Sequence, residues 1–373
     1  MSLNSSLDLT IVGAREPKPT EGVCFPAWVV ARLNNHAAIL ELPQDGTIGQ
    51  LLAKRELIVE SLTNTATIPQ SDLDDFSKKL GNVLIDGGIG PLYGEGKAGG
   101  IRINLLINDC DLQRIPWEYM CGPGELPIPD VKRSIVRIVP CHTGSIESQA
   151  SEKLRVLLAV SREPNDGDVP IDEMRAVLER KFSLRMPQEL VELVVRAVSN
   201  RADFVAAVSE RNHQWDVIHF LGHGEVNIGH SQTVGTLRLV DDAGNVEQMD
   251  ARQFATMVSA AKARLVLLTA CNSGEAAVAA PFSNIAFTTV SMGVPAVVAN
   301  QMAVPADTVA EFCGGVYDSL IQHGDIDLAV SSGRQISFST LARGDVDNAA
   351  VEWGIPILYR APGAEILFPE FAS

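Results

Sequence analysis

The second half of the chain alternates short apolar runs with longer amphipathic stretches. Each apolar run has the length of a strand and is mostly apolar, as expected of strands buried on both faces of a parallel sheet. These runs cover residues 154–161, 191–198, 215–221, 265–270, 294–299 and 355–359. The amphipathic stretches predict helices over residues 171–182, 202–211, 251–261, 281–292, 306–322 and 328–341. The alternation predicts an α/β sandwich, in which helices cover both faces of a mainly parallel central sheet.

Two details of this pattern sharpen the prediction. Asp250 precedes the third helix and suits its N-cap, because its carboxylate can accept the unpaired amides of the first turn. The run at residues 191–198 is preceded by residues 187–189, which could instead start a helix. In such a sheet, reactive side chains are expected beyond the carboxyl ends of the strands.

The first half of the chain has a mixed pattern. It predicts a hairpin of residues 28–33 and 38–42, helices over residues 48–62 and 73–85, and strands over residues 101–108 and 134–139. Residues 86–100 contain seven glycines and are predicted to form a mobile loop. The polar, aperiodic residues 143–153 are the predicted linker. We therefore expect a smaller α+β N-terminal module, residues 1–150, followed by an α/β domain, residues 151–373.

Composition excludes several classes of protein. The chain has 373 residues, of which 46% are hydrophobic and 20% charged, as in a well-buried globular protein. A formal charge of −16 argues against a nucleic-acid partner, which needs clustered Lys and Arg. The first residues lack the basic and apolar regions of a signal peptide, and the apolar stretch at residues 285–306 is too interrupted to span a bilayer. We expect a cytoplasmic protein that does not enter a membrane.

Neither a metal nor a cofactor is expected. The six cysteines show no CxxC spacing, and the histidines at positions 213, 219, 223 and 230 lack the spacing of zinc ligands. Residues 94–97 (GEGK) invite comparison with a phosphate-binding loop. However, Pro91 stands where the first glycine of that motif is needed, and Ala98 replaces its Ser or Thr.

Two predicted strands end close to a reactive side chain. Residues 217–224 (VIHFLGHG) lead to His223, and residues 265–274 (LVLLTACNSG) lead to Cys271. A thiol and an imidazole at the carboxyl ends of neighbouring strands can act as a nucleophile and its base. The backbone amides of Gly224 and Cys271 are candidates for an oxyanion hole. Taken singly, an inert buried thiol and a structural histidine are the alternatives.

Several motifs in order resemble those of one known family. They are residues 115–118 (IPWE), 135–137 (IVR), 154–158 (LRVLL), 219–224 (HFLGHG), 268–274 (LTACNSG), 293–302 (GVPAVVANQM), 312–317 (FCGGVY) and 353–356 (WGIP). From about residue 112 to the C-terminus, the chain resembles the CHAT peptidases, bacterial relatives of caspases and separases. The resemblance implies a caspase-like fold and hydrolysis of peptide bonds through a cysteine thioester.

The resemblance also assigns roles to residues. It implies that Cys271 is the nucleophile and that His223 is the general base and acid. Because the family's dyad needs no third member, Glu225 is expected to be a solvated neighbour. His219, two positions before the turn, is expected to be a core histidine. The tryptophans at positions 117 and 353 are expected to be packing residues.

Substrate specificity is less well defined. Relatives that cut after Lys or Arg often carry an acidic residue before the nucleophile, where this chain has Ala270. Caspases that cut after Asp use arginines near strand ends; Arg162 could serve in this way, or could be an ordinary surface arginine. Only residues 272–293 separate the nucleophile from the next strand, so we expect a single-chain enzyme that is not matured by cleavage there.

The resemblance further implies a protein substrate and an activating or regulatory protein partner, in antiphage defence or programmed cell death. Two alternatives stay open. One is a catalytically silent caspase-like scaffold that binds a partner through its cleft. The other is a cysteine hydrolase or acyltransferase that acts on a small molecule.

Overall fold

The structure is a computed structural model, and most of the chain is described here. The described residues are 3–13, 27–42, 46–63, 68–85, 87–141, 153–161, 175–176, 178–180, 182–183, 189–210, 214–228, 233–241, 243–269, 281–301, 304–341 and 349–371.

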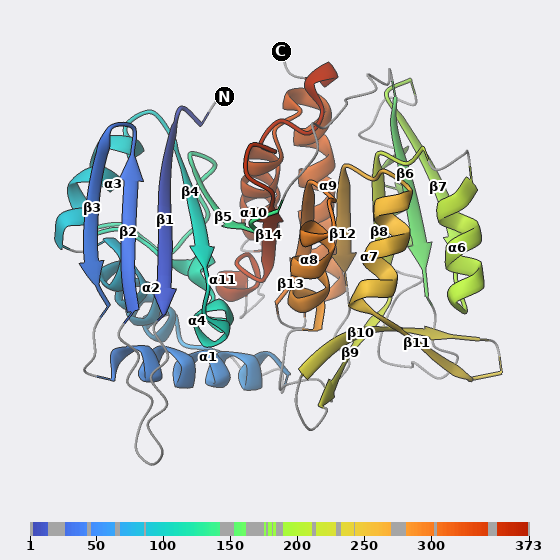
Figure 1. Cartoon of the computed structure of the whole chain (residues 1–373), viewed down its shortest axis with the longest axis horizontal. Coiled ribbons are helices and arrows are strands. Elements are labelled where there is room, and N and C mark those ends of the chain that lie inside the picture. Colours follow the sequence, from blue (N-terminus) through green and yellow to red (C-terminus); the bar gives the residue numbers. More distant parts are fainter. Residues whose placement is uncertain are drawn as a thin grey trace.

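A single sheet of eleven strands runs through the molecule (Figure 1). Its strands, in spatial order, are β3 (His36–Glu41), β2 (Ala27–Leu33), β1 (Ser5–Gly13), β4 (Ile101–Ile107), β5 (Arg133–Ile138), β14 (Pro356–Arg360), β13 (Ala296–Asn300), β12 (Leu265–Thr269), β8 (Val217–Leu221), β6 (Leu154–Val160) and β7 (Val191–Ala197). The pairings are parallel except for β1 with β2, β2 with β3, and β13 with β14. The prediction of a mainly parallel sheet is confirmed.

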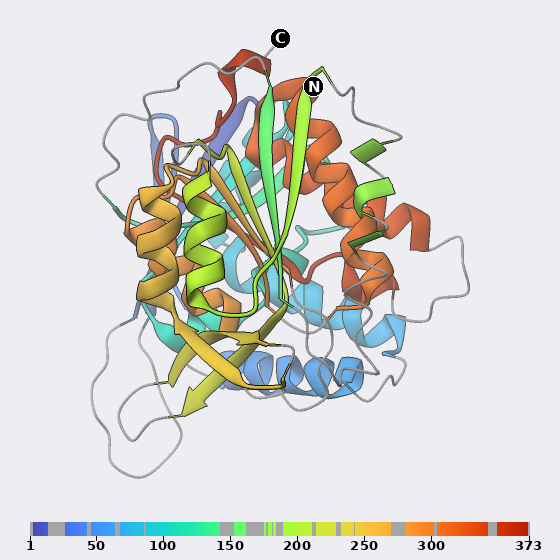
Figure 2. The same ribbon diagram turned by 90° about the vertical axis from the view of Figure 1, so that its right-hand side faces the viewer.

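Helices cover both faces of the sheet in the second half of the chain. In the first half, the described helices are α1 (Thr47–Thr63), α2 (Gln70–Ile85), α3 (Gly90–Lys97) and α4 (Cys110–Arg114). In the second half, they are α6 (Arg201–Ser209), α7 (Ala251–Ala260), α8 (Pro281–Ser291), α9 (Ala306–His323), α10 (Ile326–Leu341) and α11 (Ala349–Glu352). Figure 2 shows α6 and α7 on one side of the strands, and the paired helices α9 and α10 on the other. The predicted α/β sandwich is therefore confirmed.

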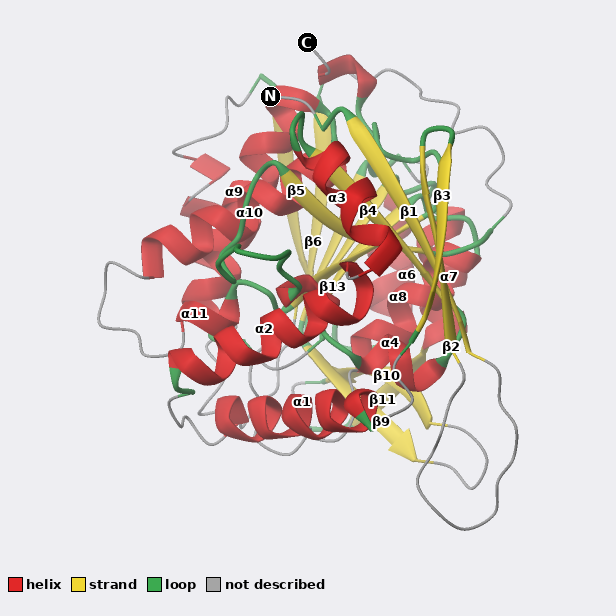
Figure 3. Ribbon diagram, turned by 90° about the vertical axis from the view of Figure 1, so that its left-hand side faces the viewer, coloured by secondary structure: helices red, strands yellow, loops and turns green. Residues whose placement is uncertain are grey.

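The two halves of the chain share this sheet. Strand β5 from the first half pairs in parallel with β14, the last strand of the chain. Figure 3 shows the N-terminal strands with α1, α2 and α3 on one side of them. The buried hydrophobic side chains of both halves form one continuous cluster. The boundary between residues 150 and 151 lies outside the described residues and stays a prediction.

Most predicted elements are present, with ends shifted by a few residues. The predicted capping role of Asp250 is confirmed, since its side chain accepts the amide of Gln253 and the Gln253 side chain accepts the Asp250 amide. Residues 191–197 form strand β7 rather than a helix. The helix expected over residues 171–182 lies largely outside the described residues, as does the linker at residues 143–153.

The prediction of a mobile loop over residues 86–100 is wrong. Most of this segment forms a 3₁₀ turn, Gly87–Ile89, and the helix α3, which has a proline in its first turn. Glycine allows α3 to approach its neighbours closely. A Cβ on Gly96 would lie 2.7 Å from Cδ1 of Ile101, so a larger residue would require the Ile101 side chain to shift.

Several elements were absent from the sequence prediction. Strand β1 lies between β2 and β4, and a separate three-stranded sheet is formed by β9 (His223–Ile228), β10 (Thr233–Val240) and β11 (Val246–Asp250). A 3₁₀ turn at Trp117–Tyr119 and another at Pro369–Phe371 complete the described elements. Among the helices described above, none has both the length and the hydrophobicity to cross a membrane.

Candidate active site

The carboxyl ends of β8 and β12 lie side by side. The two strands are parallel neighbours, and the last residue of one, Leu221, is paired with the last residue of the other, Thr269. The amide of Gly222 donates to the Thr269 carbonyl at 3.3 Å. In the sequence, His223 follows Leu221 by two residues, and Cys271 follows Thr269 by two. Cys271 itself lies outside the described residues, so the structure places only His223 at this edge.

His223 opens the small sheet. It is the first residue of β9, and its direct cross-strand neighbour on β10 is Arg238. Directly opposed residues of an antiparallel pair project from the same face, so the imidazole and the guanidinium share a side of this sheet. The Arg238 carbonyl accepts a hydrogen bond of 3.1 Å from Ser161, which follows β6. His223 is only 3% exposed, so this edge is closed around the candidate base.

The glycine before His223 is required by packing. A Cβ on Gly222 would lie 2.9 Å from the ring of Phe220 and 2.9 Å from the Cβ of Ser161. Gly224 lies within β9, opposite Leu237 of β10. The oxyanion role expected of the Gly224 and Cys271 amides remains a prediction.

His219 is buried beneath this edge. Its Nε2 lies 2.9 Å from Oγ1 of Thr269, and its Nδ1 lies 3.1 Å from the hydroxyl of Tyr317 on α9. The Thr269 hydroxyl donates to the Phe220 carbonyl at 3.2 Å. Since that proton is used, we assign Nε2 as the donor to Thr269 and Nδ1 as the acceptor from Tyr317.

Burial decides the charge of this histidine. His219 is 1% exposed, and burial lowers its pKa to about 3, so the imidazole is neutral at physiological pH. The expectation of a core histidine is confirmed. Its hydrogen bonds join β8 to β12 and both strands to α9, directly before the positions that lead to the candidate dyad.

A second buried cluster lies at the carboxyl end of β13. Arg137 of β5 makes two hydrogen bonds to the Glu118 carboxylate, of 3.0 and 2.9 Å. Gln301, which follows β13, donates to the same carboxylate at 3.3 Å and to the Gly354 carbonyl at 2.9 Å. Glu118 of the IPWE motif is therefore bonded to the residue that follows β13, a neighbour of β12, and Arg137 of the IVR motif is bonded to Glu118.

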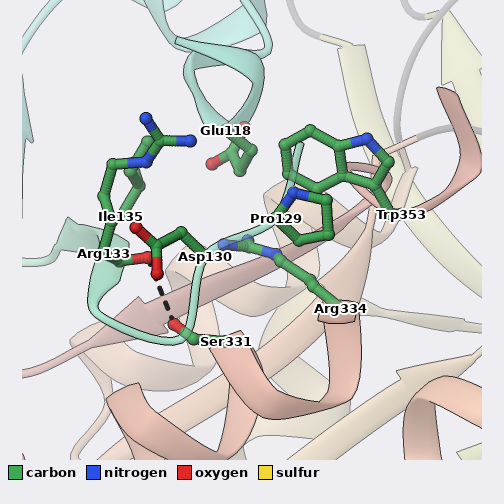
Figure 4. A pocket seen from close by; sticks show the side chains of 8 residues that line it. All are labelled: Glu118, Pro129, Asp130, Arg133, Ile135, Ser331, Arg334 and Trp353. Carbon is green, nitrogen blue, oxygen red and sulfur yellow. Dashed lines mark hydrogen bonds between the residues drawn. The ribbon is translucent and has the colours of Figure 1, made fainter. Parts of the chain in front are cut away.

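A small cavity of about 10 Å³, room for about one water molecule, lies beside this cluster. Figure 4 shows its lining, which comes from α10, the start of β5 and the loops around them. The lining residues are Glu118, Pro129, Asp130, Arg133, Ile135, Ser331, Arg334 and Trp353. Burial lowers the pKa of Arg334 to about 10, against the attraction of Glu118. The lining has mixed charge, and His223 is not among its described residues.

The remaining predicted residues have different outcomes. Trp117 is 0% exposed and Trp353 2% exposed, and the ring of Trp353 packs edge-on against Tyr119 with centroids 5.2 Å apart, so both packing roles are confirmed. Arg162 lies outside the described residues, and so does the side chain of Glu225. Within the described ranges, no three His, Cys, Asp or Glu side chains come together as a possible metal site.

Sequence reasoning missed three residues at this edge. Thr269 stands two positions before Cys271, but the sequence alone does not show that its hydroxyl contacts His219. Tyr317 lies on a helix far along the chain, and Arg238 pairs with His223 only because β10 returns beside β9. Their proximity depends on strand register, which a single sequence does not display.

The fold thus defines an α/β protein with a mainly parallel sheet whose candidate site lies at the carboxyl edge of its central strands. The chain belongs to the CHAT domain family, whose model matches residues 75–349. None of the curated proteins compared with the chain matches it.

Solved structures of similar fold include two of the separase–securin complex of Saccharomyces cerevisiae. Both are 10% identical to this chain and cover 95% of it, with TM-scores of 0.49 and 0.48. The chain spans 30% of the length of the chain it matches in those structures. A secreted C11 cysteine protease of Bacteroides thetaiotaomicron, solved with an irreversible peptide inhibitor, is 10% identical with a TM-score of 0.33, covering 51% of this chain and 59% of its own.

Proposed function

We propose that this CHAT protein is a cysteine endopeptidase that cleaves a protein substrate with a dyad of Cys271 and His223. The observation that carries the proposal is the pairing of Leu221 with Thr269, because it sets the two strand ends side by side. Each strand end leads, two residues further along the sequence, to one member of the dyad. Membership of the CHAT family supports the same assignment.

In the proposed reaction, His223 takes the proton of the Cys271 thiol, and the sulfur attacks the carbonyl carbon of the scissile peptide bond. The amides of Gly224 and Cys271 stabilise the oxyanion of the tetrahedral intermediate. Collapse of the intermediate breaks the C–N bond, and the histidine gives its proton to the leaving amine. Water, deprotonated by His223, then hydrolyses the thioester and restores the thiol.

Regulation by a partner forms part of the proposal. His223 is 3% exposed, and a substrate must reach the base before catalysis can begin. An activating protein that opens this edge in the cytoplasm, in bacterial defence or regulated cell death, fits such a closed site. The small exposed fraction of His223 also favours a second candidate, a silent scaffold that binds a partner without cleaving it.

Intact-mass labelling tests the proposal. The protein is treated with peptide acyloxymethyl ketones that differ in the residue before the warhead. The thiolate displaces the carboxylate leaving group and forms a thioether. We expect one adduct per chain in the wild type, none in Cys271→Ala, and a strongly reduced rate in His223→Ala.

The preferred peptide identifies the specificity, and a partner can be added to the same assay. An adduct that persists in Cys271→Ala would contradict the assignment of the nucleophile. A wild-type protein that stays unlabelled both alone and with its partner is the result expected of the scaffold. Hydrolysis of small esters without peptide cleavage is the result expected of a small-molecule hydrolase.

We also predict that the active enzyme stays a single chain. Helix α8 begins at Pro281, which leaves only residues 272–280 between Cys271 and that helix. Intact mass of the labelled, active protein is expected to equal that of the full chain plus one adduct. Cleavage between residues 272 and 293 in active material would contradict this prediction.

A further inference from the structure

The last residue of β13, Asn300, holds a buried amide without a hydrogen-bond partner. The side chain is 4% exposed, and no described residue accepts a hydrogen bond from its Nδ2. Buried donors in native proteins are nearly always paired, because a donor that loses its hydrogen bond to water without forming another destabilises the folded state. An unpaired donor of this kind calls for an acceptor that the described residues do not supply.

Asn300 stands at the same edge as the candidate dyad. Strand β13 is the parallel neighbour of β12, with Ala299 paired with Leu268. By the same register, Asn300 lies beside Thr269, which is itself paired with Leu221. Registered residues of parallel strands project from the same face. The carboxamide therefore lies in one row with the two residues that precede Cys271 and His223 by two positions.

The adjacent residue shows that the edge can satisfy a carboxamide. Gln301 is 5% exposed, and its Nε2 donates both to Glu118 and to the Gly354 carbonyl. The two consecutive carboxamides therefore differ in their hydrogen bonding. Gln301 joins the strand end to the Glu118 cluster, whereas Asn300 points its donor at no described protein acceptor.

We infer that the Asn300 carboxamide is a substrate-binding group, which donates from Nδ2 to a backbone carbonyl oxygen of the peptide bound at this edge. The inference rests on the proposed function, because that function brings a peptide to the row of strand ends. A peptide offers a carbonyl at every residue, so the contact supplies affinity and alignment without selecting a side chain. The bound peptide supplies the acceptor that the described residues do not provide.

The test compares two matched pairs of near-isosteric residues. Asn300→Leu removes the orphan donor, and Gln301→Met removes the paired one. A substrate-binding role predicts that Asn300→Leu keeps or raises the melting temperature while its labelling by the preferred acyloxymethyl ketone slows by about tenfold, the effect of one hydrogen bond. Gln301→Met is expected to lower the melting temperature, because it leaves part of the Glu118 cluster unpaired.

Asn300→Asp provides a second variant of the same size. Its ionised carboxylate replaces the donor by an acceptor, and labelling is expected to slow further. If Asn300→Leu and Asn300→Asp both label at the wild-type rate, the inference is wrong. It is also wrong if Asn300→Leu loses as much melting temperature as Gln301→Met, since the side chain would then be structural.

A binding measurement separates this inference from the proposed function. Fluorescein-labelled peptides with the sequences of the ketone panel are titrated into Cys271→Ala and into Cys271→Ala with Asn300→Leu. Should the wild type resist labelling while Cys271→Ala binds a peptide about tenfold more tightly than the double variant, the proposed catalysis fails and the Asn300 inference stands. Absence of peptide binding to Cys271→Ala, with no labelling of the wild type, overturns both.

Discussion

At the scale of single residues, burial and hydrogen bonding decide what the histidines can do. His219 and His223 are both almost fully buried, at 1% and 3% exposure, and they stand four residues apart. Both ring nitrogens of His219 are bonded, to Thr269 and Tyr317. A histidine committed in this way cannot exchange protons with a substrate, so its role is to hold the strand ends together.

The neutral state of His219 predicts how stability depends on pH. The pKa of His219 is about 3 in the folded chain against 6.5 as the ordinary value. Between these pH values the unfolded chain binds a proton that the folded chain refuses. The stabilisation is therefore complete above pH 6.5 and is lost as pH falls, by at most about 1.4 kcal/mol per pH unit. Urea unfolding of wild type and His219→Gln from pH 7 to pH 4 measures the difference in slope.

The wild type is expected to have the steeper loss of stability on acidification. Tyr317→Phe is the control, because it removes a hydrogen bond to the histidine but leaves the titrating group in place. It is expected to be less stable than the wild type at every pH while keeping the wild-type slope. Equal slopes in wild type and His219→Gln would show that the imidazole is not held neutral.

At the scale of elements, close packing distinguishes two helical glycines. A Cβ on Gly81 of α2 would lie 1.8 Å from the carbonyl oxygen of Cys121, whereas a Cβ on Gly49 of α1 would meet nothing within 4 Å. We expect Gly81→Ala to destabilise the fold by about 3 kcal/mol or more, since backbone must shift. Gly49→Ala is expected to stabilise it by about 0.5–1 kcal/mol, the helix propensity difference. Chemical denaturation of both variants checks this; similar effects at the two positions would contradict it.

A buried ion cluster joins three further elements. Asp327, at the start of α10, is bonded to Arg360 of β14 and to Arg102 of β4, and Arg360 also donates to Asn104. Burial raises the pKa of Asp327 to about 6 from 3.8, against the attraction of the two arginines. Between these pH values the folded chain keeps a proton that the unfolded chain has released. This contribution to stability is therefore present at low pH and lost as pH rises.

Asp327→Asn is expected to change the pH dependence in the opposite direction to His219→Gln. Relative to the wild type, the asparagine variant should gain stability as the pH rises from about 4 to 6, by up to about 1.4 kcal/mol per pH unit. Paired urea titrations at pH 4.5 and pH 7 measure the gain. A difference between the two proteins that stays constant with pH would mean that the carboxyl group is not held protonated by burial.

The elements also show what the sequence can predict. The strands β8, β12 and β13 were predictable because each is a short run of mostly apolar residues, as expected of strands buried on both faces of a sheet. Helix α3 was missed because its glycines are local helix breakers, although they allow Gly96 to pack against Ile101. Strand β9 was missed because it is polar and lacks a regular alternation of apolar and polar residues. Its formation depends on pairing with β10.

The candidate site was predictable only in part, for the same reason. The residue types and their positions at strand ends identified His223 and Cys271 as candidates. The row formed by Leu221, Thr269 and Asn300 depends on strand order and register, which follow from the packing of the whole sheet. The orphan donor of Asn300 is a property of its surroundings and is invisible in the sequence.

At the scale of the whole molecule, the shared sheet argues against independent folding of the second half. In a fragment of residues 151–373, strand β14 would lose its neighbour β5, and Gln301 would lose Glu118. Arg360 is fully buried, and in the fragment it would lose its bond to Asn104. Removing a partner from buried polar groups costs more than the contact itself was worth.

We therefore expect the fragment of residues 151–373 to lack a cooperative thermal transition, and the full chain to unfold in one step. Calorimetry of the two proteins, with near-ultraviolet circular dichroism as the measure of fixed packing, checks this. Supplying residues 1–150 as a separate chain is expected to restore the transition, because both sides of the β5–β14 pairing are then present. A fragment that melts cooperatively by itself would show that the N-terminal module is an appendage to the sheet rather than part of the folding unit.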